Sequence, residues 1–171
     1  MDISYDTEVG GLDVYHGALP YFITSCDDND QITHWEWDVD PLTRKTIVPS
    51  GDLLELSAHL EAADHWVLQN PKYDASVTKA VFEYAGVAFT WHWDRVYDTL
   101  IAGHLLASNQ PHDLTSMVLI YLGINIKPFE DRLRIACNEP RRLARSKMPD
   151  WRIAKKGLPE MPSCKGANPK K

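Results

Sequence analysis

The sequence contains little cysteine, with three residues in 171. Cys26, Cys137 and Cys164 are widely separated and have no metal-ligand spacing. An odd, scattered set argues against a disulfide framework and for a reducing compartment. We therefore expect an intracellular, cytoplasmic protein. The seven histidines form neither an HExxH motif nor a paired ligand spacing, which argues against a zinc site.

Long apolar runs and the common nucleotide-binding and hydrolase motifs are absent as well. The longest apolar run, residues 117–124, is too short to span a bilayer, so no membrane partner is expected. Acidic residues (Asp2, Asp6 and Glu8) stand where a signal peptide needs bases. The chain has no phosphate loop, no GxSxG motif and no dinucleotide-binding fingerprint.

The overall composition is that of a soluble globular domain, with 44% hydrophobic and 25% charged residues. The net charge of −6 hides an asymmetry, because residues 127–171 hold 13 bases and 5 acids, whereas the rest of the chain holds 5 bases and 19 acids. We expect one domain over residues 1–147 and a basic arm or linker rich in proline and lysine over 148–171. This arm either touches polyanions or is a solvated tail.

The order of the patterns predicts an α/β protein. An antiparallel meander of three strands is followed by a helix and by a short strand that runs parallel to the first strand. Further helices flank this mixed sheet. The expected strands are 1–9, 14–25, 31–38, 65–68 and 86–93, and the expected helices are 50–63, 74–84, 99–107, 114–123 and 129–147.

Apolar side chains at helical spacing define the expected core faces of three helices, and the tryptophans are expected to pack in the core or on the sheet. The helix residues are Leu53, Leu54, Leu56 and Leu60, then Val77, Val81 and Tyr84, and finally Leu114, Met117, Val118 and Tyr121. The tryptophans are Trp35, Trp37, Trp66, Trp91 and Trp93.

Two acids interrupt the first strand. Asp6 and Glu8 lie two residues apart, so in a strand they project side by side from one face. A hard divalent cation such as Mg²⁺ neutralises such a pair through oxygen ligands. Gly10 and Gly11 then end the strand and let another molecule approach closely. The alternative is an edge strand with two solvated acids.

A second motif follows the strand at 65–68. Residues 69–74 read QNPKYD, and Asp74 then stands at the start of a helix, at the carboxyl end of a strand. Open α/β sheets bind their ligands at that end. The alternative is that Asp74 is only a helix N-cap and Asn70 only a turn former.

Together the two motifs resemble the DEDD-type 3'-5' exonuclease family, which has a ribonuclease H-like fold. The most similar branch is the proofreading exonuclease domain of family A DNA polymerases. The resemblance covers about residues 2–124 and rests on YDTEVGGLD, LQNPKYD and the helical pair YDTLIAGHLL and PHDLTSMVLIYLG.

The resemblance implies roles for individual residues. Asp6, Glu8 and Asp74 match the metal-binding catalytic carboxylates, which hold two divalent ions, Mg²⁺ or Mn²⁺, in a two-metal phosphodiester hydrolysis. The matching substrate-side positions are Thr7, Leu12, Gln69, Asn70 and Tyr73. The implied partners are the 3' end of single-stranded DNA and a polymerase domain, in cis or in trans.

One motif of the family is missing. The family has a third motif, Tyr-x-x-x-Asp or His-x-x-x-x-Asp, on a late helix that supplies a fourth carboxylate. No tyrosine in the chain is followed by Asp four residues later, and Tyr121 is followed by Asn125. His59 and Asp64 have the His-x-x-x-x-Asp spacing, but they precede the second motif. We expect either a fragment whose continuation carries this helix or a protein that has lost catalysis.

The sequence therefore favours a metal-dependent 3'-5' exonuclease acting on single-stranded DNA ends, the proofreading module of a polymerase. Two alternatives stay open. One is a catalytically inactive nucleic-acid-binding domain, and the other is an exonuclease acting on RNA.

Overall fold

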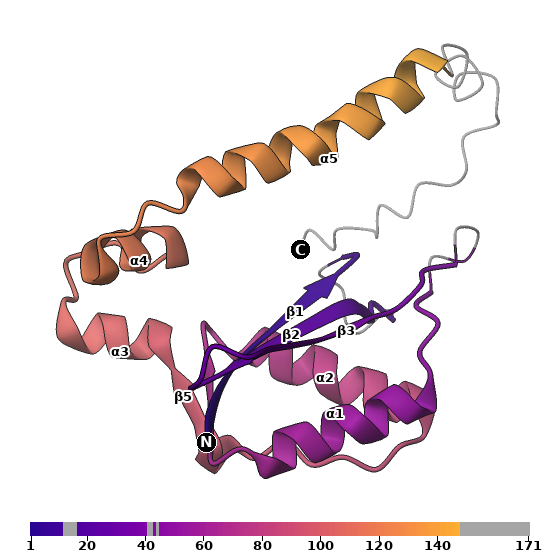
Figure 1. The fold of residues 1–171 in the computed structure, drawn as a ribbon, viewed down its shortest axis with the longest axis horizontal. Coiled ribbons are helices and arrows are strands. Elements are labelled where there is room, and N and C mark those ends of the chain that lie inside the picture. Colours follow the sequence, from indigo (N-terminus) through magenta and orange to yellow (C-terminus); the bar gives the residue numbers. More distant parts are fainter. Residues whose placement is uncertain (12–16, 41–42, 44, 148–171) are drawn as a thin grey trace, which may run out of the picture. The chain divides into compact units, whose positions relative to one another are not determined.

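The structure is a computed structural model that describes residues 1–11, 17–40, 43 and 45–147 (Figure 1). Its strands are β1 (Asp2–Val9), β2 (Pro20–Asp27), β3 (Ile32–Glu36), β4 (His65–Leu68) and β5 (Val96–Asp98). Its helices are α1 (Ser50–Ala62), α2 (Lys72–Ala85), the short 3₁₀ helix η2 (Trp93–Arg95), α3 (Thr99–Leu106), α4 (Leu114–Leu122) and α5 (Lys127–Lys147).

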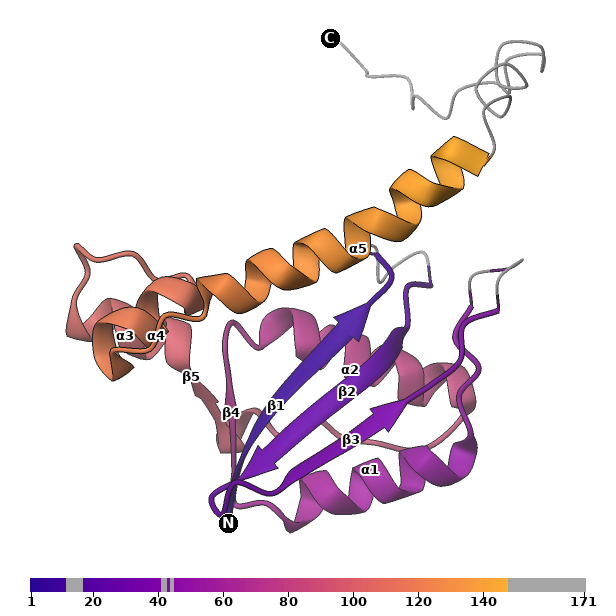
Figure 2. The same cartoon turned by 45° about the horizontal axis from the view of Figure 1, so that its top comes forward.

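The strands form one mixed sheet in the order β3-β2-β1-β4-β5 (Figure 2). β1 pairs antiparallel with β2, and β2 pairs antiparallel with β3, which confirms the predicted meander. β4 pairs parallel with β1, and β5 pairs parallel with β4. A parallel neighbour needs a crossover connection, and α1 provides it between β3 and β4. This is a ribonuclease H-like α/β arrangement.

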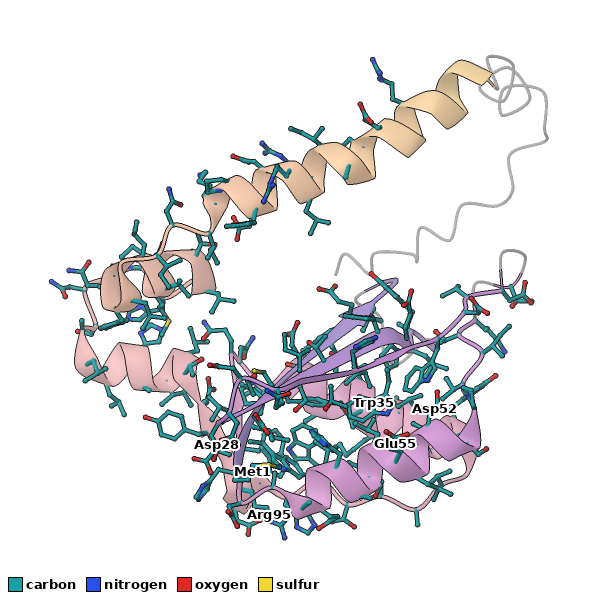
Figure 3. The ribbon with its side chains drawn as sticks, in the orientation of Figure 1. Met1, Asp28, Trp35, Asp52, Glu55 and Arg95 are labelled. Carbon is teal, nitrogen blue, oxygen red and sulfur yellow. The ribbon has the colours of Figure 1, made fainter. Side chains whose placement is uncertain are left out.

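The hydrophobic core lies between one face of the sheet and helices α1 and α2 (Figures 1 and 2). Alternation along β1 explains which side chains reach it, because Ile3, Tyr5 and Thr7 are buried whereas the residues between them are exposed. Figure 3 shows Trp35 of β3 between the sheet and α1, the helix that also carries Asp52.

The chain divides into two compact units, residues 1–117 and 118–171. The sheet and helices α1 to α3 belong to the first unit, and α5 belongs to the second. Within α5, the Arg132 guanidinium lies 4.7 Å from the centre of the Phe129 ring, and Arg134 forms an ion pair of 2.9 Å with Asp131. The predicted arm at 148–171 lies outside the described residues. No helix in the described part is long and apolar enough to cross a membrane.

Two predicted strands were placed wrongly. The strand predicted at 86–93 is an irregular segment, and β5 lies beyond it at Val96–Asp98. Trp91 of this segment is buried without strand pairing, in a cluster with Tyr5 and Trp66. The second strand begins only at Pro20, and residues 14–16 of the predicted strand lie outside the described residues.

Some predicted core positions are also wrong. Leu54 and Tyr84 are exposed although their helical neighbours Leu53 and Val81 are buried. Trp93 is exposed, unlike the other four tryptophans named above. The stripe predicted on α4 is not a core stripe, because this helix has no buried residue. Its sequence, LTSMVLIYL, is apolar nearly all round, so helical periodicity defines no single side.

The contrast between two leucines of α1 gives a test of this core. Leu56 is fully buried, whereas Leu54 is 61% exposed on the same helix. We expect Leu56→Ala to lower the free energy of unfolding by about 2–5 kcal/mol, through lost burial and the cavity left behind. Leu54→Ala is the control and should change it by less than about 0.5 kcal/mol in the same urea titration. Equal losses for both variants would contradict this packing.

Candidate active site at the carboxyl end of strand β1

Strand β1 extends beyond its parallel neighbour. β4 pairs with β1 only from Asp2 to Ser4 and ends at Leu68, so no strand among the described residues flanks the second half of β1 on that side. On its other side β1 stays paired with β2, with a register shift between Glu8 and Val9. Irregularities of this kind bend a strand and are frequent beside active sites. The second half of β1 therefore lies open at the end of the sheet where α/β proteins bind ligands.

The two predicted acids project from the exposed face of this open half. Asp6 and Glu8 are exposed, and Thr7 between them is buried on the core side. Asp6 lies opposite Thr24 of β2, and Glu8 lies opposite Phe22. The predicted side-by-side placement of the two carboxylates follows directly from this alternation.

Asp74 comes to the same place from α2. It lies in the first turn of this helix and is only 6% exposed, and its Oδ1 accepts a hydrogen bond of 2.7 Å from the Thr7 hydroxyl. The N-cap position is Pro71, and no side chain caps the helix. The Asp74 side chain is therefore not a helix cap, and its buried partner lies on β1.

Burial and neighbouring negative charge disfavour the charged forms of these carboxyl groups. Loss of solvent contact is the main cause that raises the pKa of Asp6, Glu8 and Asp74 above their usual values. The negative charges of Asp6 and Asp74 raise the pKa of Glu8 further, and the charge of Asp6 raises that of Asp74. The Thr7 hydroxyl acts in the opposite sense, because its hydrogen bond favours the charged form of Asp74. The predicted set thus gathers negative charge at one point.

Tyr73 closes the site on the side of the glycine pair. Its hydroxyl donates a hydrogen bond of 2.8 Å to the Gly11 carbonyl oxygen, which ties the first turn of α2 to the end of β1. Burial, Asp74 and Glu8 raise the pKa of the Tyr73 phenol, in that order of size. A Cβ atom added at Gly10 or Gly11 would meet no described residue within 4 Å.

The other predicted substrate-side residues differ in what their side chains do. Thr7 is committed to Asp74, and the Gln69 amide nitrogen donates to the His112 carbonyl oxygen at 3.0 Å. Both side chains therefore hold the site together. Asn70 is exposed at the surface. Leu12 lies outside the described residues.

The donor set fits a hard cation by its chemistry, because it consists of carboxylate oxygens without a sulfur or imidazole ligand. Within the described residues, no group of three His, Cys, Asp or Glu side chains is close enough together to hold a metal ion. Metal binding by Asp6, Glu8 and Asp74 is therefore a proposal.

Sequence reasoning missed two residues that border the site. Asp98 caps α3 through a hydrogen bond of 2.9 Å from the Leu100 amide. It also accepts from the Asn70 amide, and the Thr99 hydroxyl hydrogen-bonds to Gln69. A correct placement of β5 would have revealed this role of Asp98, because a strand that ends at residue 98 puts Asp98 beside the end of β4.

No protein-family model and no curated protein matches the sequence. Among solved structures, the chain is similar to the crystal structure of the Aedes aegypti Nibbler EXO domain, with a TM-score of 0.49 and 12% sequence identity. The similarity covers 73% of this chain and 60% of that chain. The assignment of a ribonuclease H-like fold rests on the strand order and the directions of pairing described above.

The bond between Thr7 and Asp74 can be tested by a nearly isosteric change. Thr7→Val removes the hydroxyl donor of the buried Asp74 carboxylate, so we expect the free energy of unfolding to fall by about 1–3 kcal/mol at pH 7. Thr7→Ser keeps the hydroxyl and should cost about 0.8 kcal/mol or less, the value of one buried methyl group. Equal losses in chemical denaturation would show that the hydroxyl contributes nothing.

The raised pKa values of Asp6, Glu8 and Asp74 should make the metal-free protein less stable at neutral pH than at low pH. Their pKa values are raised in the folded state, so the folded protein binds more protons than the unfolded chain above a pH of about 4. Stability contributed by these groups therefore falls as pH rises from that value through the raised pKa values.

We expect Asp6→Asn to relieve this repulsion in the presence of a chelator. At pH 7 the variant should be more stable than the unchanged protein, by roughly 0.5 kcal/mol. The gain should shrink as pH falls below about 4, where the carboxyl is protonated in both states. Thermal unfolding across a pH series is the measurement. A loss of stability at pH 7 would mean that the charge of Asp6 is compensated in the folded protein.

Proposed function

We propose that this protein is a metal-dependent 3'-5' exonuclease that removes nucleotides from single-stranded DNA ends. The observation that carries the proposal is the placement of Asp6 and Glu8 on the exposed face of the open half of β1, with Asp74 hydrogen-bonded to Thr7 between them. Burial and the negative charge of Asp6 raise the pKa of both Glu8 and Asp74. Concentrated negative charge of this kind is costly unless cations neutralise it.

Each residue has a task in the proposed site. Asp6 and Glu8 offer exposed carboxylate oxygens from β1, and Asp74 offers a third from α2. Thr7 orients Asp74 by its hydrogen bond, and Tyr73 holds the glycine pair against α2. Bound divalent ions, Mg²⁺ or Mn²⁺, would activate the attacking water and stabilise the leaving oxygen. Asn70 would donate hydrogen bonds to the sugar or phosphate oxygens of the strand.

The finer proposal is that the chain is the proofreading module of a family A DNA polymerase. It is supported by the order and spacing of the two motifs, with Asp6 and Glu8 on the first strand and Asp74 after the strand β4. A polymerase domain would then act in cis or in trans. RNA is an alternative substrate, and it should be tested beside DNA in the same cleavage assay.

A second candidate function is metal-assisted nucleic-acid binding without turnover. One observation favours it. No Tyr-x-x-x-Asp pattern occurs in the sequence, and His59 and Asp64, which have the His-x-x-x-x-Asp spacing, precede the second motif. A missing acid that positions the water would lower the rate by about 10²–10⁴-fold without abolishing binding.

We expect the chain to bind Mn²⁺ and to shorten a 5'-labelled single-stranded DNA oligonucleotide from its 3' end, slowly. Asp6→Asn and Asp74→Asn should abolish both metal-dependent stabilisation and cleavage, because each removes a charged oxygen ligand. Gel analysis of the products, with a matched RNA oligonucleotide beside the DNA, gives the direction of cleavage and the preferred substrate. Chelation of the metal should stop the reaction.

Glu36→Gln is the matched control, since Glu36 is an exposed acid on β3, on the same sheet. It should leave metal binding and cleavage unchanged. Binding of the oligonucleotide without shortening would favour the second candidate function. Cleavage that survives Asp6→Asn and Asp74→Asn together would refute the proposed site, and failure to bind either oligonucleotide would refute both functions.

A further inference from the structure

Asp98 links the end of β5 to the end of β4. It is the last residue of β5 and lies in register with Leu68, the last residue of β4. Its Oδ1 atom accepts two main-chain hydrogen bonds, from the Leu100 amide at 2.9 Å and from the Asn70 amide at 3.2 Å. One carboxylate oxygen therefore begins helix α3 and also holds the turn that leads into α2.

The residue held in this way has an unusual backbone conformation. Asn70 has a φ of 59°, in the left-handed region that few residues other than glycine adopt. Asn tolerates this region, but the conformation persists only where neighbouring groups enforce it. The bond from the Asn70 amide to Asp98 is such a constraint, and Asn70 remains exposed beside the candidate site.

The turn has further support on the same side. The Thr99 hydroxyl lies 3.1 Å from the Leu68 carbonyl oxygen and also hydrogen-bonds to the Gln69 side chain. The Gln69 amide nitrogen in turn donates to the His112 carbonyl oxygen. The segment from 68 to 70 is thus anchored to the start of α3 and to the loop before α4.

Asp74 is anchored independently, from the opposite side. Its partner is Thr7 of β1, and that bond involves none of the residues that hold Asn70. The site therefore has two separate supports, one for the carboxylates and one for the turn that carries Asn70. Loss of the second support should change how the site binds a strand and leave the carboxylates in place.

We propose that Asp98 is a positioning residue of this site, which acts through the Asn70 main chain to set the affinity for the 3' end of a single-stranded nucleic acid. This inference rests on the proposed function. The chemistry is that of an Asn amide donating to sugar or phosphate oxygens, for which the left-handed turn fixes the direction of the side chain.

The test measures the affinity of the full chain for a short, fluorescently labelled single-stranded DNA oligonucleotide in the presence of Ca²⁺, which takes oxygen ligands. Asp98→Ala should weaken binding about tenfold, whereas Asp98→Asn, which keeps an acceptor oxygen, should bind like the unchanged protein. Asn70→Gly removes the side chain without straining the left-handed backbone, and it should weaken binding to the same degree.

A double-mutant cycle separates this role from a merely structural one. If Asp98 acts through Asn70, the double variant Asp98→Ala with Asn70→Gly should bind no more weakly than Asn70→Gly alone. Hydrogen exchange of the Asn70 amide should be faster in Asp98→Ala and unchanged in Asp98→Asn. If Asp98→Ala does not fold, Asp98→Ser takes its place, because serine caps a helix but its oxygen lies one bond closer to the main chain.

Asp113→Ala is the control for the loss of a helix-capping acid, since Asp113 accepts from the Ser116 amide at the start of α4. It should keep the affinity for the oligonucleotide. Additive losses in the cycle, or unchanged affinity in both Asp98→Ala and Asp98→Ser, would overturn the inference while the proposed function stands. An unchanged protein that binds no oligonucleotide would refute the proposed function itself, and the inference with it.

Discussion

The hydrogen bond between Thr7 and Asp74 is the contact on which the candidate site depends. Both side chains are buried, and they are 67 residues apart in the sequence. The bond fixes the start of α2 against the open half of β1, where no strand covers that side. Because Thr7 points into the core, its neighbours Asp6 and Glu8 must point outward. The inward direction of Thr7 therefore places Asp74 on the core side of β1 and Asp6 and Glu8 on its exposed face.

The short length of β4 makes this arrangement possible. A longer β4 would pair with the second half of β1 and occupy the place of the first turn of α2. Instead, the chain leaves β4 at Leu68, turns through Asn70 and begins α2 beside β1. Parallel strands end at one edge of the sheet, so the ends of β1, β4 and β5 all supply residues to one region. The sheet topology, more than any local motif, collects these side chains.

Local patterns predicted the parts of the site that depend on local geometry. The alternation of β1 is sufficient to place Asp6 and Glu8 on one face, and the short segment HWVL at 65–68 was sufficient to place β4. The partner of Thr7 had no local signal, because the bond spans two distant segments. The role of Asp98 toward Asn70 was missed for a related reason. Its strand has only three residues, too few to show a period.

The failures elsewhere also have physical causes. Trp91 and Trp93 alternate as in a strand, yet Trp91 packs against Tyr5 and Trp66 from an irregular segment. Aromatic rings gain burial without strand pairing, so their spacing alone does not identify a strand. In α4 the composition is apolar on every side, and periodicity then carries no information about which side is buried. In both segments the spacing of the apolar residues does not follow from the backbone conformation, so it predicts neither a strand nor a buried helix face.

Electrostatics connects the proposed metal to the proposed substrate. The chain before residue 127 holds 19 acids and 5 bases, so the body of the protein repels a polyanion. The carboxylates of Asp6, Glu8 and Asp74 also repel one another. A divalent cation at this point would relieve both repulsions, because it reverses the local sign of charge. Metal and nucleic acid should therefore bind cooperatively, and by reciprocity each must strengthen the binding of the other to the same extent.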